Sequence, residues 1–367
     1  MNVLVTGSEG FIGKNLIVRL AERSIKHICF NSHNSIDELP GLLKDVDFVF
    51  HLAGVNRPLD PTEFHRGNYG LTSILCQAIQ NTGRAIPVVF TSSVQANLDN
   101  DYGRSKRAAE EVLIKHNAAT NSPVRLYRLP NIFGKWAKPN HNSVIATFCH
   151  NISQGLPIRI DNPNKVISLV YIDDLLDEFI LMLKTPQEGV SRSMVEPIYV
   201  TTLGSLASQI GAFKESRRTL MVESVGVGLE RALYATYLSY LKPEQFTYQI
   251  PTYQDERGCF IEILKTKNAG QFSFFTAHPG ITRGGHYHHT KSEKFLVVQG
   301  SARYSFLHIV TNEAYELVVD AASPRIVETI PGWTHDITNI GENELIVLLW
   351  SSEVFDHSRP DTIDNKE

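Results

Sequence analysis

The sequence predicts an α/β domain with a doubly wound parallel sheet, followed by an all-β domain. Apolar strands alternate with amphipathic helices through the first half of the 367 residues, and a glycine-rich turn follows the first strand directly. From about residue 246 the helical pattern gives way to short apolar runs separated by turn residues. We therefore expect an α/β domain over residues 1–245 and an antiparallel β-sandwich or small barrel over residues 246–367.

The elements of the first domain follow from hydrophobic periodicity. Leu16, Ile17 and Leu20 recur on one side of the first predicted helix. Residues from about 140 to 245 are expected to complete this domain as a small substrate-binding subdomain. The predicted strands are 2–7, 26–31, 46–54 and 85–93, and the predicted helices are 13–23 and 70–80.

Short apolar runs in the second domain predict strands without intervening helices. Turn residues separate these runs, as in an antiparallel sandwich or barrel. The runs are 271–277, 294–300, 302–310, 314–319, 325–332 and 344–350.

Charge and composition exclude several classes of protein. A net charge of −4, from 35 basic and 39 acidic residues, lacks the basic footprint of a nucleic-acid-binding protein. The four cysteines are scattered and form no CxxC pair, so we expect neither a thiolate zinc site nor disulfides. The sequence contains no membrane-spanning apolar run and does not open with a signal peptide. We expect a cytoplasmic protein without a membrane span.

The stretch "VTGSEGFIG" predicts a dinucleotide-binding loop. Gly7 permits a tight turn, Gly10 lets the backbone approach a pyrophosphate, and Gly13 lets the helix and strand pack closely. The start of the following helix favours phosphate charge. Because the loop lies between a strand and a helix, dinucleotide binding is favoured over a purely structural turn.

The end of the second strand indicates which dinucleotide is bound. NAD-preferring sites usually carry an acidic residue there, which binds the ribose 2′-hydroxyl. Here the strand runs into Asn31, Ser32 and His33, and the sequence reaches no carboxylate until Asp37. A 2′-phosphate would not be repelled, so we predict NADPH as the cofactor.

The stretch "DYGRSKRAAEEVL" predicts a catalytic helix. Tyr102 and Lys106 are four residues apart, which puts both on one helical face. An ammonium beside the phenol is expected to lower the tyrosine pKa from about 10, so that Tyr102 can exchange a proton with a substrate oxygen. Ser93, in the preceding "FTSS", is predicted to hold the substrate carbonyl, with Ser92 and Thr91 as alternatives.

Six motifs together resemble the extended short-chain dehydrogenase/reductases: "TGxxGxxG", "FHLAG", "TSS", "YxxxK", "YRLPNIFG" and "VYIDDL". The resemblance covers residues 1–245 and implies a Rossmann-type domain that performs redox chemistry on a nucleotide sugar. It also implies that "NSVIATF" receives the sugar nucleotide. The catalytic residues are then Ser93, Tyr102 and Lys106, and the cofactor contacts are Gly7, Gly10, Phe11, Ile12, Gly13, Asn31, Ser32, His33, Leu52, Ala53, Gly54, Tyr102, Lys106, Pro130 and Asn131.

The stretch "GGHYHHTKSEKFLVVQG" predicts a metal site in the second domain. His286 and His288 are two residues apart, so on a strand they point to the same face. Glu293 can return to the same cavity after a turn, and "PGWTHDITN" adds His335 and Asn339. Three imidazoles and a carboxylate suit a divalent transition metal, with zinc as the first choice.

The spacing G-x5-H-x-H-x4-E-x6-G resembles the first motif of the cupins, over residues 250–367. "DERGCFIEI" and "TRGGH" are also similar to the rhamnose-pathway 3,5-epimerases, which are metal-free cupins. The first likeness makes His286 a metal ligand, and the second makes it the catalytic base. Glu293 favours the metal, and the base is then left to candidates such as Tyr287 and His289.

The order of the two domains resembles the CapF-type family of capsular polysaccharide biosynthesis enzymes. This resemblance implies a homodimer that acts on a UDP-2-acetamido-2,6-dideoxy-4-hexulose. The cupin domain would epimerise C3, and the first domain would reduce the C4 ketone with NADPH to give UDP-N-acetyl-6-deoxy-L-talosamine. The pairing is chemically sensible, because the ketone acidifies the C3 proton and its reduction then fixes the configuration.

Other interpretations of the sequence stay open. The first domain can instead be a nucleotide-sugar 4-epimerase or dehydratase, which retains and recycles its cofactor. The cupin can be a noncatalytic module that binds sugar or mediates dimerisation around a structural metal. A redox-sensing scaffold that binds NADPH without turnover is a further alternative.

Overall fold

The computed structural model describes residues 1–185, 188–358 and 360–364 and divides into two compact units. Unit 1 contains Met1–Ile210 and Ala232–Leu241, and unit 2 contains Gly211–Arg231 and Lys242–Glu367. Two of the three limits fall inside helices, α8 (Leu203–Thr219) and α9 (Gly228–Leu238), and the third follows α9. The domain boundary at residues 245/246 stays a prediction.

A parallel sheet forms the centre of unit 1, in the strand order β2-β1-β3-β4-β5-β8. After β2 the chain returns to the opposite side of β1, so the direction of winding reverses between β1 and β3. In such sheets ligands bind outside the carboxyl ends of the strands at this reversal. The strands are β1 (Asn2–Thr6), β2 (Lys26–Phe30), β3 (Phe48–His51), β4 (Val88–Ser93), β5 (Val124–Leu129) and β8 (Val190–Ser193).

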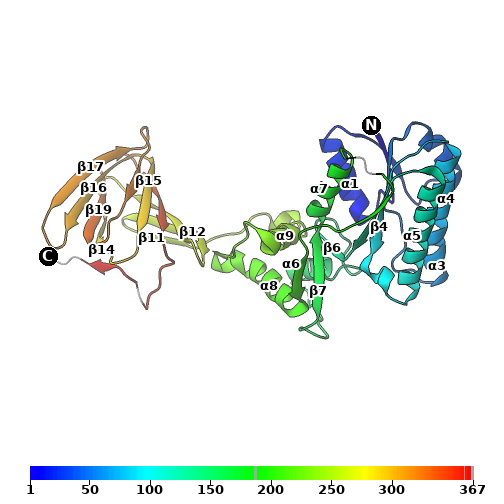
Figure 1. Ribbon diagram of the computed structural model, residues 1–367. Coiled ribbons are helices and arrows are strands. Elements are labelled where there is room, and N and C mark those ends of the chain that lie inside the picture. The colour runs from blue at the N-terminus through cyan, green and yellow to red at the C-terminus, as the bar shows by residue number, and fades with distance from the viewer. Residues whose placement is uncertain (186–187, 359, 365–367) are drawn as a thin grey trace. The chain divides into compact units, whose positions relative to one another are not determined.

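Helices cover both faces of this sheet (Figure 1). On one face α1 (Phe11–Glu22) and α7 (Ile172–Met182) pack together, and Phe179 of α7 contacts the Phe50 ring of β3 at 5.1 Å. On the other face α4 (Leu71–Asn81) and α5 (Asp101–Thr120) share an apolar core with the strands. The sheet is therefore buried on both faces, which explains its nearly uninterrupted apolar strands.

The rest of unit 1 consists of a smaller sheet and further helices. A second sheet joins β6 (Asn131–Phe133), β7 (Val166–Tyr171) and β9 (Tyr199–Thr202). The other helices are α2 (Leu39–Leu42), α3 (Thr62–Phe64) and α6 (Val144–Gln154). None of the helices within the described residues is long and apolar enough to cross a bilayer.

Unit 2 is built mainly from two β-sheets. One sheet has the order β10-β12-β13-β20-β15-β18, with β11 paired to β12, and the other has the order β17-β16-β19-β14-β21. All these pairs are antiparallel except β10 with β12. The strands of the first sheet are β10 (Met221–Val222), β11 (Thr252–Asp255), β12 (Gly258–Thr266), β13 (Gly270–Ala277), β15 (Glu293–Gln299), β18 (Ile326–Glu328) and β20 (Leu345–Ser351). Those of the second are β14 (Thr282–Tyr287), β16 (Ser301–His308), β17 (Ala314–Asp320), β19 (Trp333–Asn339) and β21 (Ile363–Asp364).

Both sheets contribute to one apolar core. Phe275 and Phe295 come from the first sheet, and Tyr304 and Ile337 come from the second. Alternating side chains of each strand point into this core, as in a sandwich of two sheets. The predicted fold class, a Rossmann-type doubly wound α/β domain followed by an all-β C-terminal domain, is confirmed.

Candidate active site and candidate metal centre

The glycine loop after β1 packs so tightly against neighbouring backbone that Gly7 and Gly13 leave no room for a side chain. Gly7 has a φ of +68°, and a Cβ there would lie 2.7 Å from the Ala53 backbone. A Cβ on Gly13 would lie 2.2 Å from the Gly7 carbonyl oxygen. The N-cap of α1 is Gly10, and its first turn receives no side-chain cap among the described residues. The first N–H groups of α1 are thus left to an anion such as a pyrophosphate.

A cavity of about 650 Å³ opens at the reversal between β1 and β3. Its walls come from the segments that follow β1, β3, β4 and β5, as expected for a dinucleotide site. The structure brings most of the predicted residues to this wall: Gly7, Gly10, Phe11, Ile12, Gly13, Leu52, Gly54, Ser93, Tyr102, Lys106, Pro130 and Asn131. Ala53 instead supports the wall from behind, because its N–H donates to Thr6 Oγ1 at 3.2 Å.

The residues predicted to contact the adenosine end of the cofactor do not line the cavity. Asn31, Ser32 and His33 are not part of the cavity wall, and Ser32 and His33 are exposed. The carboxylate of Glu9, in the glycine loop, reaches this place. Its Oε1 accepts from Asn31 Nδ2 at 3.1 Å, and its Oε2 lies 3.5 Å from His33 Nε2. The sequence-based preference for NADPH rested only on the residues that follow the second strand, and it did not foresee a carboxylate from the glycine loop.

Tyr102 lies in the first turn of α5, directly after a short loop from β4. Asn100 caps the helix, with its Oδ1 accepting from the Gly103 N–H at 2.7 Å. A Cβ on Gly103 would lie 2.2 Å from the Gln95 carbonyl oxygen, so this close turn requires glycine. Lys106 follows one helical turn later, and both side chains line the cavity.

The environments of Lys106 and Tyr102 set their protonation. Lys106 Nζ donates to the Thr91 carbonyl oxygen at 2.9 Å and lies 4.7 Å from the centre of the Phe90 ring. Burial lowers the pKa of Lys106 to about 8, although Glu110 opposes the shift. Burial raises the pKa of Tyr102, and a hydrogen bond with Ser93 only partly offsets it. The predicted lowering of the tyrosine pKa is thus wrong for this arrangement, because burial of the phenol outweighs the nearby charge.

The polar contacts distinguish the three candidate hydroxyl groups of β4. Ser92 Oγ donates to the buried carboxylate of Glu110 at 2.5 Å. Arg128 binds the same carboxylate through two hydrogen bonds, Nε to Oε1 at 2.9 Å and Nη2 to Oε2 at 2.6 Å. Ser93 is hydrogen-bonded to Tyr102 and lines the cavity. Its hydroxyl is therefore the one beside the phenol.

The other end of the cavity contains residues that the sequence reasoning missed. The predicted sugar-nucleotide segment does line it, from Asn142 through Ile145 at the start of α6. Lys14, Lys138 and the half-exposed Trp136 line it as well. Lys138, and Lys14 from the first turn of α1, give the cavity positive charge of the kind that a diphosphate favours. The available signal for Trp136 and Lys138 was the pattern "GKWAKPN", whereas Lys14 belongs to α1 and has no part in that pattern.

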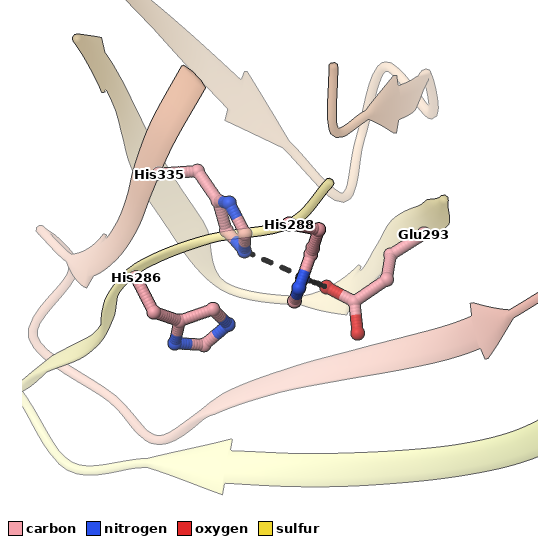
Figure 2. A group of neighbouring side chains, drawn as sticks. All are labelled: His286, His288, Glu293 and His335. Atoms are coloured by element: carbon pink, nitrogen blue, oxygen red, sulfur yellow. Dashed lines mark hydrogen bonds and ion pairs between the residues drawn. The ribbon is translucent and has the colours of Figure 1, made fainter. Parts of the chain in front are cut away.

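Four predicted ligands gather between the sheets of unit 2. His286 belongs to β14 and His288 follows it, Glu293 begins β15, and His335 lies in β19. One donor atom of each residue lies within 4.8 Å of every other. His288 Nε2 lies 3.1 Å from Glu293 Oε2, and His335 Nε2 lies 3.5 Å from the same oxygen. Figure 2 shows these side chains turned toward one another.

The charge state of the cluster is that of a ligand set. Burial, with His335 and His288 beside it, lowers the pKa of His286 to about 4. Burial opposes ionisation of Glu293, but hydrogen bonds from His288 and His335 outweigh it and hold the pKa of this carboxyl well below its usual range. When four ligand atoms each lie about 2.0 Å from a tetrahedral zinc ion, they lie roughly 3.3 Å from one another. Imidazole and carboxylate donors at the observed separations therefore fit a divalent transition metal.

Neighbouring candidates in the same stretches lie outside the cluster. The Asn339 amide donates to the carbonyl oxygens of Ala277 at 2.9 Å and Asn343 at 2.8 Å, which is a structural role. Tyr287 and His289 contact each other, with ring centres 5.5 Å apart, and neither belongs to the ligand group. Alternation along β14 explains this for Tyr287, which lies between His286 and His288, whereas His289 belongs to the turn that follows.

Two family models match the chain. The NAD dependent epimerase/dehydratase family matches residues 3–196, and the Polysaccharide biosynthesis C-terminal domain matches residues 253–363. The crystal structure of the capsular polysaccharide assembling protein CapF from Staphylococcus aureus matches at a TM-score of 0.91 and 37% identity, covering 100% of both chains. The chain belongs to the CapF-type branch of the NAD dependent epimerase/dehydratase family. The resemblance predicted from the sequence is thereby confirmed.

Other relatives match the CapF-type chain over different lengths. The UDP-2-acetamido-2,6-beta-L-arabino-hexul-4-ose reductase of Pseudomonas aeruginosa is 53% identical over 363 residues, which cover 99% of this chain and 98% of that protein. The UDP-glucose 4-epimerase of Thermus thermophilus, solved with NAD, has a TM-score of 0.56 and 17% identity, covering 65% of this chain and 99% of its own. At that identity the second likeness concerns the fold alone.

Proposed function

We propose that the CapF-type chain is a nucleotide-sugar reductase that reduces the C4 ketone of a UDP-2-acetamido-2,6-dideoxy-4-hexulose. One observation carries the proposal: Ser93, Tyr102 and Lys106 meet in a cavity whose other wall is a glycine loop at a helix start. The full-length likeness to a UDP-hexulose reductase supports the substrate class. Capsular polysaccharide precursor synthesis is the proposed context, because of the likeness to CapF.

The residues at the end of β4 and the start of α5 would handle the substrate oxygen. Bound nicotinamide cofactor supplies the hydride. Ser93 and Tyr102 are hydrogen-bonded to each other in the absence of substrate, and on binding they would exchange this bond for hydrogen bonds donated to the C4 oxygen. Because burial raises the pKa of Tyr102, the phenol keeps its proton at neutral pH and can donate it to the developing alkoxide. Lys106, within the same wall, would then return the proton to the tyrosine.

NADPH is the proposed cofactor. Asn31 and His33 offer hydrogen-bond donors at the adenosine end, where a 2′-phosphate needs them. In this structure those donors face Glu9, so a 2′-phosphate would have to displace or neutralise that carboxylate. Dissociation constants for NADPH and NADH test the choice directly, and tighter binding of NADH would contradict it.

The β-domain is proposed to epimerise C3 before the reduction. The carbon beside a ketone loses its proton readily when the ketone oxygen is stabilised. A bound divalent metal, with zinc preferred, supplies a Lewis acid for that oxygen. His286, His288, Glu293 and His335 would hold the metal, so His286 is assigned as a ligand rather than as the base. The product after both steps is UDP-N-acetyl-6-deoxy-L-talosamine.

The assignment is tested by following the cofactor during turnover. Purified full-length protein is incubated with the UDP-4-keto sugar and NADPH, and both NADP⁺ and the nucleotide sugar are quantified. We expect one NADPH to be oxidised per sugar reduced. A 4-epimerase or dehydratase retains and recycles its cofactor, so turnover without net oxidation would contradict the reductase. The proposed homodimer and the cytoplasmic location stay separate predictions, the first of them open to sedimentation analysis.

A further inference from the structure

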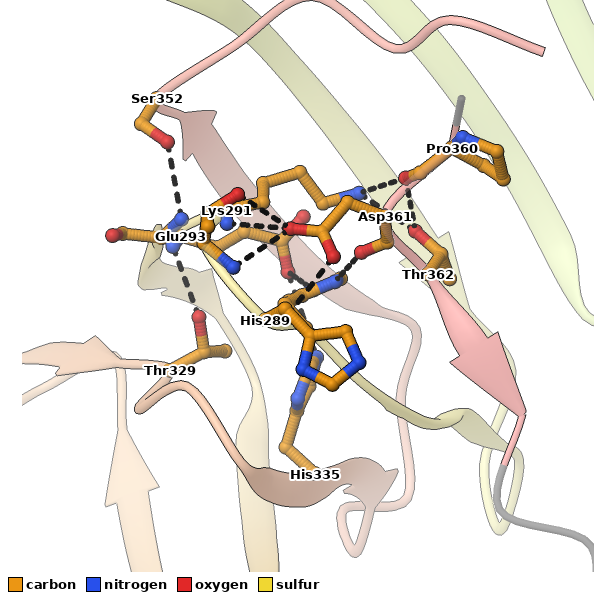
Figure 3. A network of polar contacts seen from close by, with 12 residues as sticks. His289, Lys291, Glu293, Thr329, His335, Ser352, Pro360, Asp361 and Thr362 are labelled. Carbon is orange, nitrogen blue, oxygen red and sulfur yellow. Dashed lines mark hydrogen bonds and ion pairs between the residues drawn. The ribbon is translucent and has the colours of Figure 1, made fainter. Parts of the chain in front are cut away.

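The segment of residues 360–364 lies against the turn that joins two ligand strands of the metal cluster. Its last part, β21, pairs antiparallel with β14, so that Asp364 is opposite His286 and Ile363 is opposite Tyr287. The turn of residues 289–292 separates His288 from Glu293 and is shown beside this segment in Figure 3. The segment is therefore joined by backbone pairing to the strand that precedes the turn.

The side chain of Asp361 binds the backbone of this turn. Its Oδ1 accepts from the His289 N–H at 3.0 Å. Its Oδ2 accepts from the N–H groups of Thr290 at 2.9 Å and Lys291 at 2.8 Å. The Thr290 hydroxyl also donates to Oδ2, at 3.0 Å. One carboxylate thus binds three consecutive N–H groups and fixes the turn between two ligands.

The main-chain oxygen of Asp361 orients one of those ligands. His288 Nδ1 lies 2.6 Å from it and, as the only possible donor of the pair, must carry the proton. Nε2 is then the ring nitrogen available to a metal, and in this structure it lies 3.1 Å from Glu293 Oε2. Metal-bound histidines generally have such a partner on the second ring nitrogen. By contrast, Nδ1 of His335 has no hydrogen-bond partner within the part of the chain that the structure describes.

Lys291 binds the segment in the opposite direction. Its side chain is buried, and its Nζ donates to Thr362 Oγ1 at 2.7 Å and to the Pro360 carbonyl oxygen at 3.3 Å. Asp361 therefore binds the turn while the turn binds both neighbours of Asp361. Neither side of this arrangement can shift without breaking hydrogen bonds of the other.

We propose that Asp361 is a positioning residue of the metal centre: it fixes the turn of residues 289–292 and so presents His288 Nε2 to the metal. The inference rests on the proposed metal site. It adds a residue that does not itself touch the metal. Asp361 lies 73 residues after His288, the ligand that it orients.

The test uses full-length protein loaded with Zn²⁺. Asp361→Ala removes all four carboxylate hydrogen bonds, Asp361→Asn keeps an oxygen acceptor, and Asp364→Ala is the matched control, since Asp364 is exposed in the same segment. Zinc affinity is measured by competition with a chromogenic chelator, with circular dichroism to verify folding. We expect Asp361→Ala to weaken zinc binding about tenfold to a hundredfold, Asp361→Asn to weaken it less, and Asp364→Ala to leave it unchanged.

A second readout separates positioning from general stability. Cobalt(II) replaces zinc, and its visible absorption spectrum reports the ligand geometry. We expect both Asp361 variants to alter this spectrum while Asp364→Ala preserves it. Wild-type zinc affinity and an unaltered cobalt spectrum in folded Asp361→Ala would overturn the inference alone. A wild-type chain that holds no stoichiometric zinc would overturn the proposed metal site itself, and the inference with it.

Discussion

At the residue scale, the proposed reduction depends on a phenol that stays protonated. Burial raises the pKa of Tyr102, which is hydrogen-bonded to Ser93. Burial also lowers the pKa of Lys106 to about 8. The two groups therefore differ in the pH at which they lose a proton. This difference gives each residue a separate signature in the kinetics.

Removing the phenolic hydroxyl should abolish reduction without disturbing the metal centre. For Tyr102→Phe we expect the rate of NADPH oxidation to fall by roughly 10²- to 10⁴-fold, because the proton donor to the C4 oxygen is lost. Exchange of the C3 proton should continue at the wild-type rate, since the ligand cluster is built from other residues. Proton NMR and NADPH absorbance measure the two activities on one preparation. Loss of both activities in a folded variant would contradict separate sites.

The protonation of Lys106 should appear in the pH profile. Its ammonium is present below pH about 8 and is lost above it, so the steady-state rate of reduction, which requires Tyr102 to be reprotonated, should decline as the pH rises through that value. The Tyr102 phenol, with a raised pKa, remains protonated over this range. Lys106→Arg keeps the charge and should move the decline to higher pH. An unchanged decline in that variant would assign it to another group.

At this scale the sequence indicated which candidate groups lie together where those groups are close in the chain. Tyr102 and Lys106 share a helix, and His286 and His288 share a strand direction, so periodicity alone joins them. Glu9 and Asp361 escaped prediction, because each reaches its partners across a tertiary contact, Glu9 over 22 residues and Asp361 over about 70. No local pattern distinguishes these carboxylates from ordinary surface charges.

At the element scale, one buried carboxylate links the strand and the helix that carry the catalytic residues. Glu110 of α5 accepts from Ser92 of β4 and from Arg128 of β5. This arrangement fixes the end of β4 relative to α5, which carries Tyr102 in its first turn. It also occupies the Ser92 hydroxyl, which explains why Ser93 is the hydroxyl beside the phenol.

Replacing this carboxylate should destabilise the elements together. For Glu110→Ala we expect a loss of about 3 kcal/mol in the free energy of unfolding, because Arg128 and Ser92 lose their buried partner. Glu111→Ala, at the exposed position beside it, is the matched control and should change stability by at most about 0.5 kcal/mol. Thermal unfolding by calorimetry, resolved into the transitions of the two units, measures both. Equal effects of the two substitutions would show that the buried pairing contributes little.

Most helices and strands were predictable because their apolar residues recur with different periods. The strands near residues 2–7 and 85–93 and the helix near 70–80 were each anticipated, and β1, β4 and α4 correspond to them. β19 was not anticipated as a strand, because "WTHDITN" mixes polar and aromatic residues. Two of its polar positions are the candidate ligand His335 and the buried amide of Asn339, and such buried polar residues obscure the β pattern.

At the scale of the whole molecule, the proposal joins two chemistries that each need the C4 ketone. Epimerisation at C3 requires the ketone, because it acidifies the neighbouring proton. Reduction removes the ketone and so fixes the configuration. The fold class and the domain order were predictable from the sequence, whereas the sharing of α8 and α9 between the two compact units was not. Such sharing depends on contacts that periodicity does not encode.

The most direct test of the account is a proton NMR time course in heavy water. Wild-type protein is mixed with the UDP-4-keto-6-deoxy sugar and no NADPH, and the C3 proton signal is followed, with His288→Ala as the control that removes a metal ligand. The account predicts loss of the C3 signal with wild-type protein and its persistence with the variant. A C3 signal that persists with wild-type protein, while the same preparation oxidises NADPH on this sugar, would contradict the account and leave a reductase with a noncatalytic β-domain.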